Sequence, residues 1–229
     1  SDTSWQRNHG RAAHLAAIDG MLYGDAPDEG FIRGQDFMHP ILRFRFSVPE
    51  DFKLINSSQA VFAKAPGGAV IKFDMADADG STRSYLTDIW AEGLRLRGIR
   101  EINSTLDGVT AIHEQSGKIS RLVVLRAGEG RVYRFVMQSP ASEFGALDEG
   151  FKATARDFKR LSVAEAGKLK PLKIKILTVR ENDTVQDFVE QMKGVEAPEE
   201  MFRIMNGLGQ TEALISGTKV KVITDSQMF

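Results

Sequence analysis

The chain has 229 residues, of which 42% are hydrophobic and 27% charged, and its formal net charge is −1. This composition is typical of a globular protein with one large domain or two modest ones, and the near-neutral charge gives no electrostatic basis for binding nucleic acid or an anionic membrane. The absence of cysteine excludes disulfides, thiol catalysis and cysteine-ligated zinc.

The first residues show no basic segment followed by an apolar core, so we do not expect them to be a signal peptide. No apolar run approaches the roughly 18 residues of a transmembrane helix. The first residue is not methionine, so we expect the chain to be a fragment of a longer polypeptide. A chain without cysteine is compatible with the bacterial periplasm.

The N-terminal region, residues 1–40, is predicted to hold a helix and a packing arm. Apolar residues recur on one face over residues 8–22, which predicts a short helix. A turn-rich connector follows, and residues 30–40 show no clear period. We expect this irregular arm to pack on another domain through three residues: Phe31, Phe37 and His39.

The next region alternates in hydrophobicity, which predicts strands. Residues 41–48 place every second side chain on one buried face, and a Pro-Gly-Gly turn joins two further strands at 59–64 and 69–75. A helix is predicted over residues 81–98, ending at Gly98.

Three more strands, 109–114, 119–126 and 132–138, precede the clearest predicted helix, 142–161. Ser142 is the predicted N-cap of this helix. Its apolar side chains form one stripe, with four charged residues largely outside that stripe: Asp148, Glu149, Lys152 and Arg156.

Hairpins joined without crossovers favour an α+β fold in which helices flank an antiparallel sheet. The predicted sheet domain spans 41–162, and residues 163–171 are a predicted linker. Residues 172–229 are predicted to form a small βααβ domain.

The four histidines do not have the spacing of a zinc site. His9 and His14 lie five residues apart, no His-Glu-x-x-His motif is present, and His39 and His113 stand alone. Nucleophile-elbow and phosphate-loop motifs are also missing from the sequence. We therefore predict no catalytic residue, metal ligand or cofactor in this chain, which leaves open whether the full-length protein is an enzyme.

Two clusters in the first quarter of the chain, Ile18-Asp19-Gly20-Met21 and Phe37-Met38-His39-Pro40, occur with a Phe46-Ser47-Val48-Pro49 strand. Together they resemble the region that follows the catalytic domain in bacterial putative Zn-dependent proteases of the His-Glu-x-x-His family that includes the CaaX prenyl proteases. The resemblance implies a missing upstream catalytic domain that would hold zinc. No catalytic residue of that family has a counterpart here.

Residues 42–162 resemble the PsbP-like fold, through the Phe-x-Val-Pro strand and a closing helix that ends Asp157-Phe158-Lys159-Arg160-Leu161. This resemblance implies a sandwich of sheet and helices and says little about function.

Residues 174–224 resemble the LysM module, a βααβ carbohydrate-binding fold, through Asn182-Asp183-Thr184 and Asn206. Asn182 stands where the family usually has glycine. The resemblance implies a glycan groove lined by Glu181, Asn182, Asp183, Thr184, Asn206, Gly207 and Leu208. The same residues also suit an ordinary helix N-terminus and an ordinary turn. The small core of this module is expected to contain Met201, Phe202, Ile204 and Met205.

The resulting hypothesis is a non-catalytic accessory region of a bacterial zinc metallopeptidase, which positions substrate proteins or anchors the peptidase in the periplasm or cell envelope. Its partners would be the upstream catalytic domain, substrate proteins and the peptidoglycan of the cell wall. The alternative is an independent module that binds peptidoglycan, a polymer containing N-acetylglucosamine, with no protease role.

Overall fold

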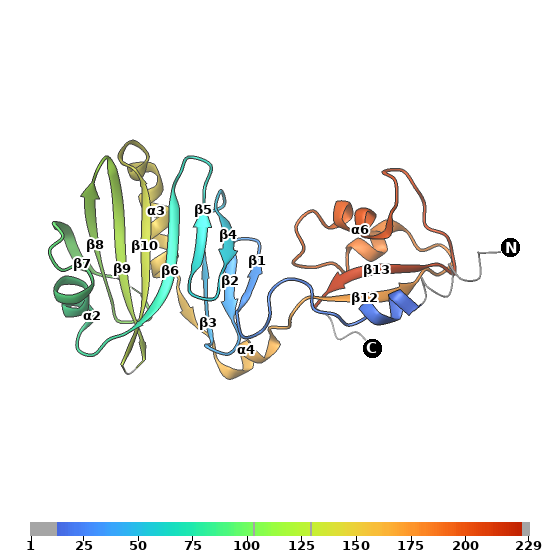
Figure 1. Ribbon diagram of the computed structural model, residues 1–229, viewed down its shortest axis with the longest axis horizontal. Coiled ribbons are helices and arrows are strands. Elements are labelled where there is room, and N and C mark those ends of the chain that lie inside the picture. Colours follow the sequence, from blue (N-terminus) through green and yellow to red (C-terminus); the bar gives the residue numbers. More distant parts are fainter. Residues whose placement is uncertain (1–12, 103, 129, 226–229) are drawn as a thin grey trace. The chain divides into compact units, whose positions relative to one another are not determined.

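The computed structural model describes residues 13–102, 104–128 and 130–225, and these form two compact units (Figure 1). The sheet unit is Asp28–Lys168. The βααβ unit combines two separate stretches of chain, Ser1–Pro27 and Leu169–Phe229, so the sheet unit is inserted within it.

The sheet unit contains a seven-stranded sheet in which all neighbouring strands are antiparallel. Its order is β4 (Lys53–Asn56), β5 (Val61–Lys64), β6 (Val70–Asp77), β10 (Arg131–Pro140), β9 (Lys118–Gly128), β8 (Gly108–Gln115) and β7 (Leu96–Glu101). The α+β class with antiparallel sheets is therefore as predicted.

A second, four-stranded sheet covers part of the first. Its order is β1 (Phe31–Arg33), β2 (Asp36–His39), β3 (Phe44–Ser47) and β11 (Lys159–Arg160). The helical segments of this unit are α2 (Thr82–Ser84), the π-helical turn η1 (Tyr85–Trp90), α3 (Ala141–Arg156) and α4 (Val163–Lys168).

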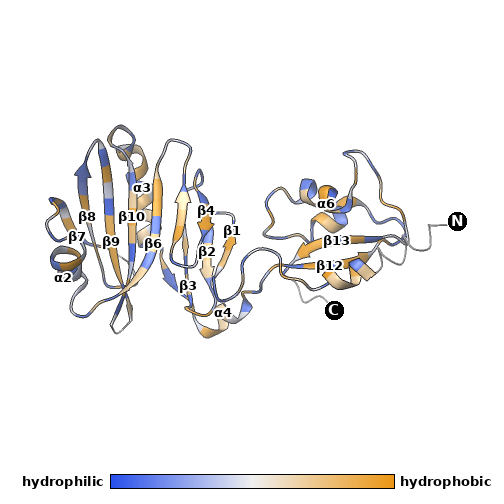
Figure 2. Cartoon of the chain, viewed as in Figure 1, coloured by the Kyte–Doolittle hydropathy of each residue, from blue (hydrophilic) through white to orange (hydrophobic). Residues whose placement is uncertain are grey.

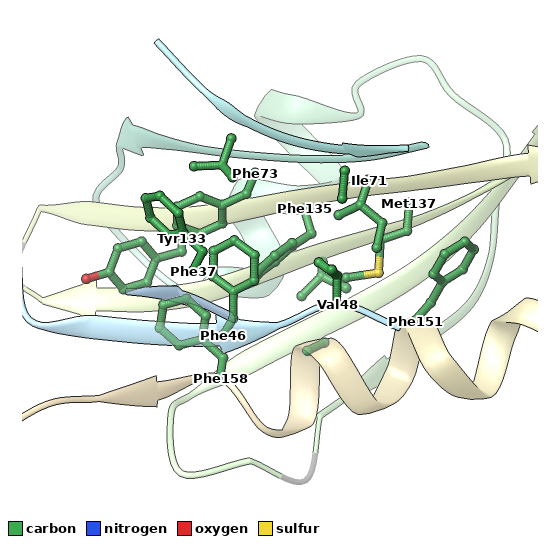
Figure 3. Close-up of a cluster of buried hydrophobic side chains, with 14 of the residues drawn as sticks. Phe37, Phe46, Val48, Ile71, Phe73, Tyr133, Phe135, Met137, Phe151 and Phe158 are labelled. Carbon is green, nitrogen blue, oxygen red and sulfur yellow. The ribbon is translucent and has the colours of Figure 1, made fainter. Parts of the chain in front are cut away.

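Both faces of the seven-stranded sheet are buried, because apolar residues of its central strands belong to a core cluster on each side. Figure 2 shows the hydrophobic residues of these strands in orange. On one face Tyr133, Phe135 and Met137 of β10 meet α3 and the second sheet (Figure 3). On the other face Val132 and Val136 of the same strand pack with η1, which continues directly from α2.

Aromatic rings dominate the larger core. Phe46 is 1% exposed, and its ring centroid lies 4.9 Å from that of Phe73 and 5.2 Å from that of Phe135. Phe158 stacks at 5.4 Å on Phe44. Tilted and edge-on rings at these distances add to the hydrophobic gain of burial, so this cluster joins the two sheets and the end of α3.

The βααβ unit is built from β12 (Lys173–Thr178), α5 (Val185–Val189), α6 (Pro198–Asn206) and β13 (Lys219–Thr224). The two strands pair antiparallel, with Thr178 opposite Lys219. Phe188 of α5 and Phe202 of α6 stack at 5.7 Å in the small core beneath the helices.

The N-terminal segment completes this unit. Residues 13–18 are helical, and the following residues run along β12. The Gly20 amide donates to the Ile174 carbonyl at 2.8 Å, the Ile174 amide donates to Met21 at 2.9 Å, and the Tyr23 amide donates to Leu172 at 2.8 Å. The Asp19 carboxylate accepts the Ile176 amide at 3.0 Å. Residues 19–23 therefore protect one edge of β12.

Several local predictions were wrong. Residues 30–40 are not irregular but form the β1–β2 hairpin, and the helix expected over 81–98 ends at Trp90, after which β7 begins at Leu96. Gly93 and Gly98 have φ values of +78° and +61°, which a helix cannot accommodate. Helix α3 begins after Pro140 and ends at Arg156, so Ser142 is not its N-cap.

The chain between the two units also differs from the predicted boundaries. Residues 28–40 belong to the sheet unit, since β1 and β2 are part of its second sheet. Residues 163–168 of the predicted linker form α4, and residues up to Pro27 belong with the βααβ unit.

Truncation of Phe46 to alanine should reveal how much of the sheet unit depends on the aromatic cluster. We expect Phe46→Ala to lower the free energy of unfolding by about 3–5 kcal/mol, the cost of a large cavity in a tightly packed core. Urea unfolding followed by circular dichroism measures this loss. Ile41→Ala is the control, because Ile41 is 63% exposed and its truncation should cost less than about 0.5 kcal/mol. Equal effects of the two substitutions would contradict the assignment.

Candidate functional site

The turn after β12 carries four of the residues predicted to bind glycan, and its backbone is tightly held. Asn182 has φ +69°, a left-handed conformation. This agrees with its position in the sequence, where LysM modules usually have glycine, because asparagine tolerates positive φ better than most residues. Asp183 closes the turn, since its carboxylate accepts the Arg180 amide at 2.7 Å. Glu181 and Asn182 are exposed. The turn therefore presents two polar side chains on a hydrogen-bonded backbone.

Thr184 and Asp187 form a capping box at the start of α5. The Thr184 amide donates to the Asp187 carboxylate at 2.7 Å, and the Thr184 hydroxyl donates to the same oxygen at 2.6 Å. These hydrogen bonds, from the side chain first and the backbone second, lower the pKa of Asp187. The Thr184 hydroxyl is thus engaged in the helix cap.

Asn206 at the end of α6 is fully engaged inside the unit. Its amide nitrogen donates to the carbonyls of Phe202 and Lys221, both at 2.9 Å, and its amide oxygen accepts the Lys221 amide at 2.7 Å. Both donor hydrogens are therefore used. Asn206 joins α6 to β13, which is the role of a structural residue.

Gly207 ends α6 in the left-handed conformation, with φ +65°, and the Leu208 amide donates back to Arg203 at 2.9 Å. The Arg203 guanidinium holds the following loop, donating to the carbonyl of Gly209 at 2.9 Å and that of Glu212 at 3.2 Å. This loop is therefore ordered by the helix that precedes it.

The turn after β12 and the loop before β13 lie side by side. The Val179 amide donates to Thr218 at 2.8 Å, and the Gly217 amide donates to Val179 at 2.8 Å. The predicted residues 181–184 thus adjoin the start of β13, whereas Asn206 attaches to Lys221 within that strand. The turn at residues 181–184 therefore lies at one end of the small sheet, and Asn206 is attached farther along β13.

A hollow of about 740 Å³ lies over the outer side of α6 and the start of the next loop. Of the residues predicted to bind glycan, only Leu208 lines this hollow. The other lining residues are Glu199, Glu200, Arg203, Ile204 and Gln210. Ile204 is 67% exposed, so it does not fill the small core as expected, and Ile215 in the loop is equally exposed. The helical spacing of Ile204, two residues after buried Phe202, could have indicated an outward position.

The residues expected to pack on another domain are buried within the sheet unit itself. Phe31, Phe37 and His39 are 1%, 0% and 7% exposed. The His39 Nδ1 accepts the Leu42 amide at 3.2 Å. Burial lowers the pKa of His39, an effect partly offset by Asp28, so the neutral imidazole is favoured at pH 7. These three side chains are therefore not available to dock another domain.

Among residues 13–102, 104–128 and 130–225, no three histidine or carboxylate side chains are grouped so as to hold a metal ion. His9 lies outside the described residues. His113 Nδ1 is 3.3 Å from the Arg95 carbonyl.

In the described part of the chain, no helix is both long and apolar enough to cross a membrane.

No family model matches the sequence, and no curated protein matches it. Solved structures similar to the chain include one from Bacteroides thetaiotaomicron, at 13% identity and TM-score 0.41, which covers 77% of this chain. The chain spans only 60% of that structure's length.

A structure of cyanobacterial PsbP (CyanoP) from Synechocystis is similar at 11% identity and TM-score 0.42, covering 60% of this chain and 98% of that one. LpqN of Mycobacterium tuberculosis, described as involved in cell envelope biogenesis, is similar at 12% identity and TM-score 0.36, covering 66% and 96%. A PsbP structure is thus among the similar chains, as the resemblance of residues 42–162 predicts. TM-scores below 0.5 do not define the function of this chain.

Removal of the Thr184 hydroxyl should raise the pKa of Asp187. The lowered pKa means that the cap stabilises α5 fully above the ordinary aspartate pKa, about 3.9, and that this stabilisation is lost as the pH falls through the lowered value. We expect Thr184→Ala to move the Asp187 titration toward the ordinary pKa in carboxyl-detected NMR. Thr184→Ser, which keeps the hydroxyl, should leave it low. An unchanged titration in Thr184→Ala would show that the hydroxyl is not the cause.

Asn206→Ala should loosen the connection between α6 and β13. The substitution leaves the Lys221 amide and the carbonyls of Phe202 and Lys221 without their partner, at a cost of about 1–3 kcal/mol. Hydrogen exchange should show faster exchange of the Lys221 amide. In Asn206→Asp the side-chain oxygen still accepts that amide, so its exchange should remain slower than in Asn206→Ala. Identical rates in both variants would contradict this role.

Proposed function

We propose that this chain is the non-catalytic binding region of a bacterial zinc metallopeptidase, and that its βααβ unit is a LysM-like module that attaches the peptidase to glycan of the cell envelope. The zinc and the catalytic residues would belong to an upstream domain. The periplasm or cell envelope would be the place of action.

One observation carries this proposal. Residues 19–21 belong to the cluster that resembles the region following the catalytic domain of these proteases, and the same residues are hydrogen-bonded along β12. A chain arriving from an upstream domain would therefore be fixed directly to the βααβ unit. Such a connection suits a module that holds a neighbouring domain at a surface.

The surface for glycan would be the turn after β12 and the adjoining loop before β13. Exposed Glu181 and Asn182 offer hydrogen-bonding groups, and backbone groups of the hydrogen-bonded turn add to them. Exposed Ile215 of the loop before β13 offers apolar surface for the flat faces of sugar rings. A preformed site of this kind loses little conformational entropy on binding.

Titration with the N-acetylglucosamine tetramer tests the glycan part of the proposal. We expect saturable NMR shifts of the backbone amides from Glu181 to Thr184 at millimolar sugar. Asn182→Gly removes the side chain and retains a residue suited to positive φ, so it should weaken binding severalfold without altering the fold. Lys193→Ala, on an exposed residue outside this surface, is the control.

The absence of shifts at millimolar sugar would overturn the glycan assignment. Binding that is unaffected by Asn182→Gly and by Glu181→Gln would move the site away from this turn. A full-length sequence that lacks a His-Glu-x-x-His motif upstream would favour the alternative, an independent peptidoglycan-binding module without a protease role.

A further inference from the structure

A cavity of about 250 Å³ lies within the sheet unit, between α3 and the β7–β8–β9 side of the seven-stranded sheet. Its walls combine four cationic side chains with apolar ones. The lining residues are Arg100, Glu101, Ile102, Thr110, Arg121, Val123, Lys152, Ala155 and Arg156.

Arg121 is the unusual member of this lining, because it is a cation 1% exposed in the middle of a sheet. It lies on β9 between Ile119 and Val123 in the alternation that faces α3. Its partner on α3 is Asp148, which lies on the same inward face of the helix as Phe144 and Phe151. The sequence analysis placed Asp148 outside the apolar stripe of this helix, and the structure corrects that position.

The protein uses only some of the hydrogen-bond donors of Arg121. Its Nε donates to an Asp148 carboxylate oxygen at 2.7 Å, and Nη1 donates to the Thr110 hydroxyl at 2.9 Å. Nη2 lies 2.6 Å from the same Asp148 oxygen, yet it makes no hydrogen bond and is buried. Nη2 is thus paired with Asp148 by charge, but its N–H groups are not in hydrogen-bond geometry, and an acceptor in the cavity would engage them.

The cavity wall is rich in positive charge, with Glu101 as its one acidic residue among those described. Neighbouring acids balance part of this charge: Lys152 lies 3.0 Å from Asp148, and Arg156 lies 3.6 Å from Glu149 and 3.2 Å from Asp157. Glu149 and Asp157 are 74% and 64% exposed, so water screens them strongly. Arg100 forms no ion pair with any residue that the structure describes.

We propose that this cavity binds a small organic anion, with its carboxylate or phosphate group on Arg121 and Arg100 and its apolar body against Ile102, Val123 and Ala155. Guanidinium groups suit both kinds of anion, because their planar donors pair with two oxygens at once. The volume lies just under the range of about 300–1,000 Å³ typical of ligand pockets, so the ligand is a compact one. The site is independent of the glycan surface proposed for the βααβ unit.

Titration of the whole chain with octanoate and with octyl phosphate tests this site, with 1-octanol as the uncharged probe. We expect one or both anions to produce saturable NMR shifts of the Thr110, Val123 and Ala155 amides, and the stronger of the two identifies the preferred head group. Octanol should produce much weaker shifts. An absence of shifts with both anions at millimolar concentration, or equal shifts with octanol, overturns the proposal.

Arg100→Gln removes one exposed cation from the cavity wall and should weaken anion binding roughly fivefold, the effect of a single exposed charge. Arg83→Gln makes the same charge change on α2, which packs against the opposite face of the sheet, and should not alter binding. Equal affinities of the two variants would overturn the placement of the anion.

The double variant Arg121→Met/Asp148→Met separates ligand binding from a purely structural role. Replacing a buried ion pair by apolar side chains of similar size generally preserves the fold, so its amide spectrum should remain dispersed. Anion binding should weaken by at least about tenfold, because the buried charged donor is gone. A folded double variant that binds octanoate and octyl phosphate as the unmodified chain does would show that Arg121 serves only to hold α3.

Discussion

Burial of both faces of the seven-stranded sheet is the constraint on which the sheet unit depends. A sheet whose central strands are apolar on both sides needs a cover on each side. The aromatic cluster around Phe46 and Phe73 holds the second sheet and α3 on one face, and α2 with η1 packs on the other. The cavity beside Arg121 lies under α3 on the first of these faces.

Much of this architecture could be predicted from local patterns. The alternation over residues 132–138 and the apolar stripe of α3 depend on short-range periodicity, and both elements lie where that periodicity indicates. The βααβ order of the C-terminal region followed from the same kind of signal. Apolar periodicity therefore located the long elements, while their ends were less well defined.

The elements missed by the sequence analysis depend on distant partners or on backbone conformation. The β1–β2 hairpin is stabilised by β3 and the core, and residues 19–23 pair with a strand about 150 positions later. For the candidate sites, the turn at Asn182 was predicted from its residue types. The hydrogen bonds of Asn206 inside the unit were not predicted, because its partner Lys221 is 15 residues away and comes close only in the folded chain. Arg121 was missed because its pair with Asp148 joins a strand to a helix.

The interrupted βααβ unit has a consequence for the order of folding during synthesis. The carboxylate of Asp19 and the amide of Ile176, which bond at 3.0 Å, are 157 residues apart. On the ribosome the N-terminal segment is made first, but its partner strand emerges only after the whole sheet unit. The sheet unit can therefore fold while the N-terminal segment is still unpaired, and loop closure across the folded insert comes last. In any chain that stops before β12, the N-terminal segment lacks its partner strand and is accessible to proteases and chaperones.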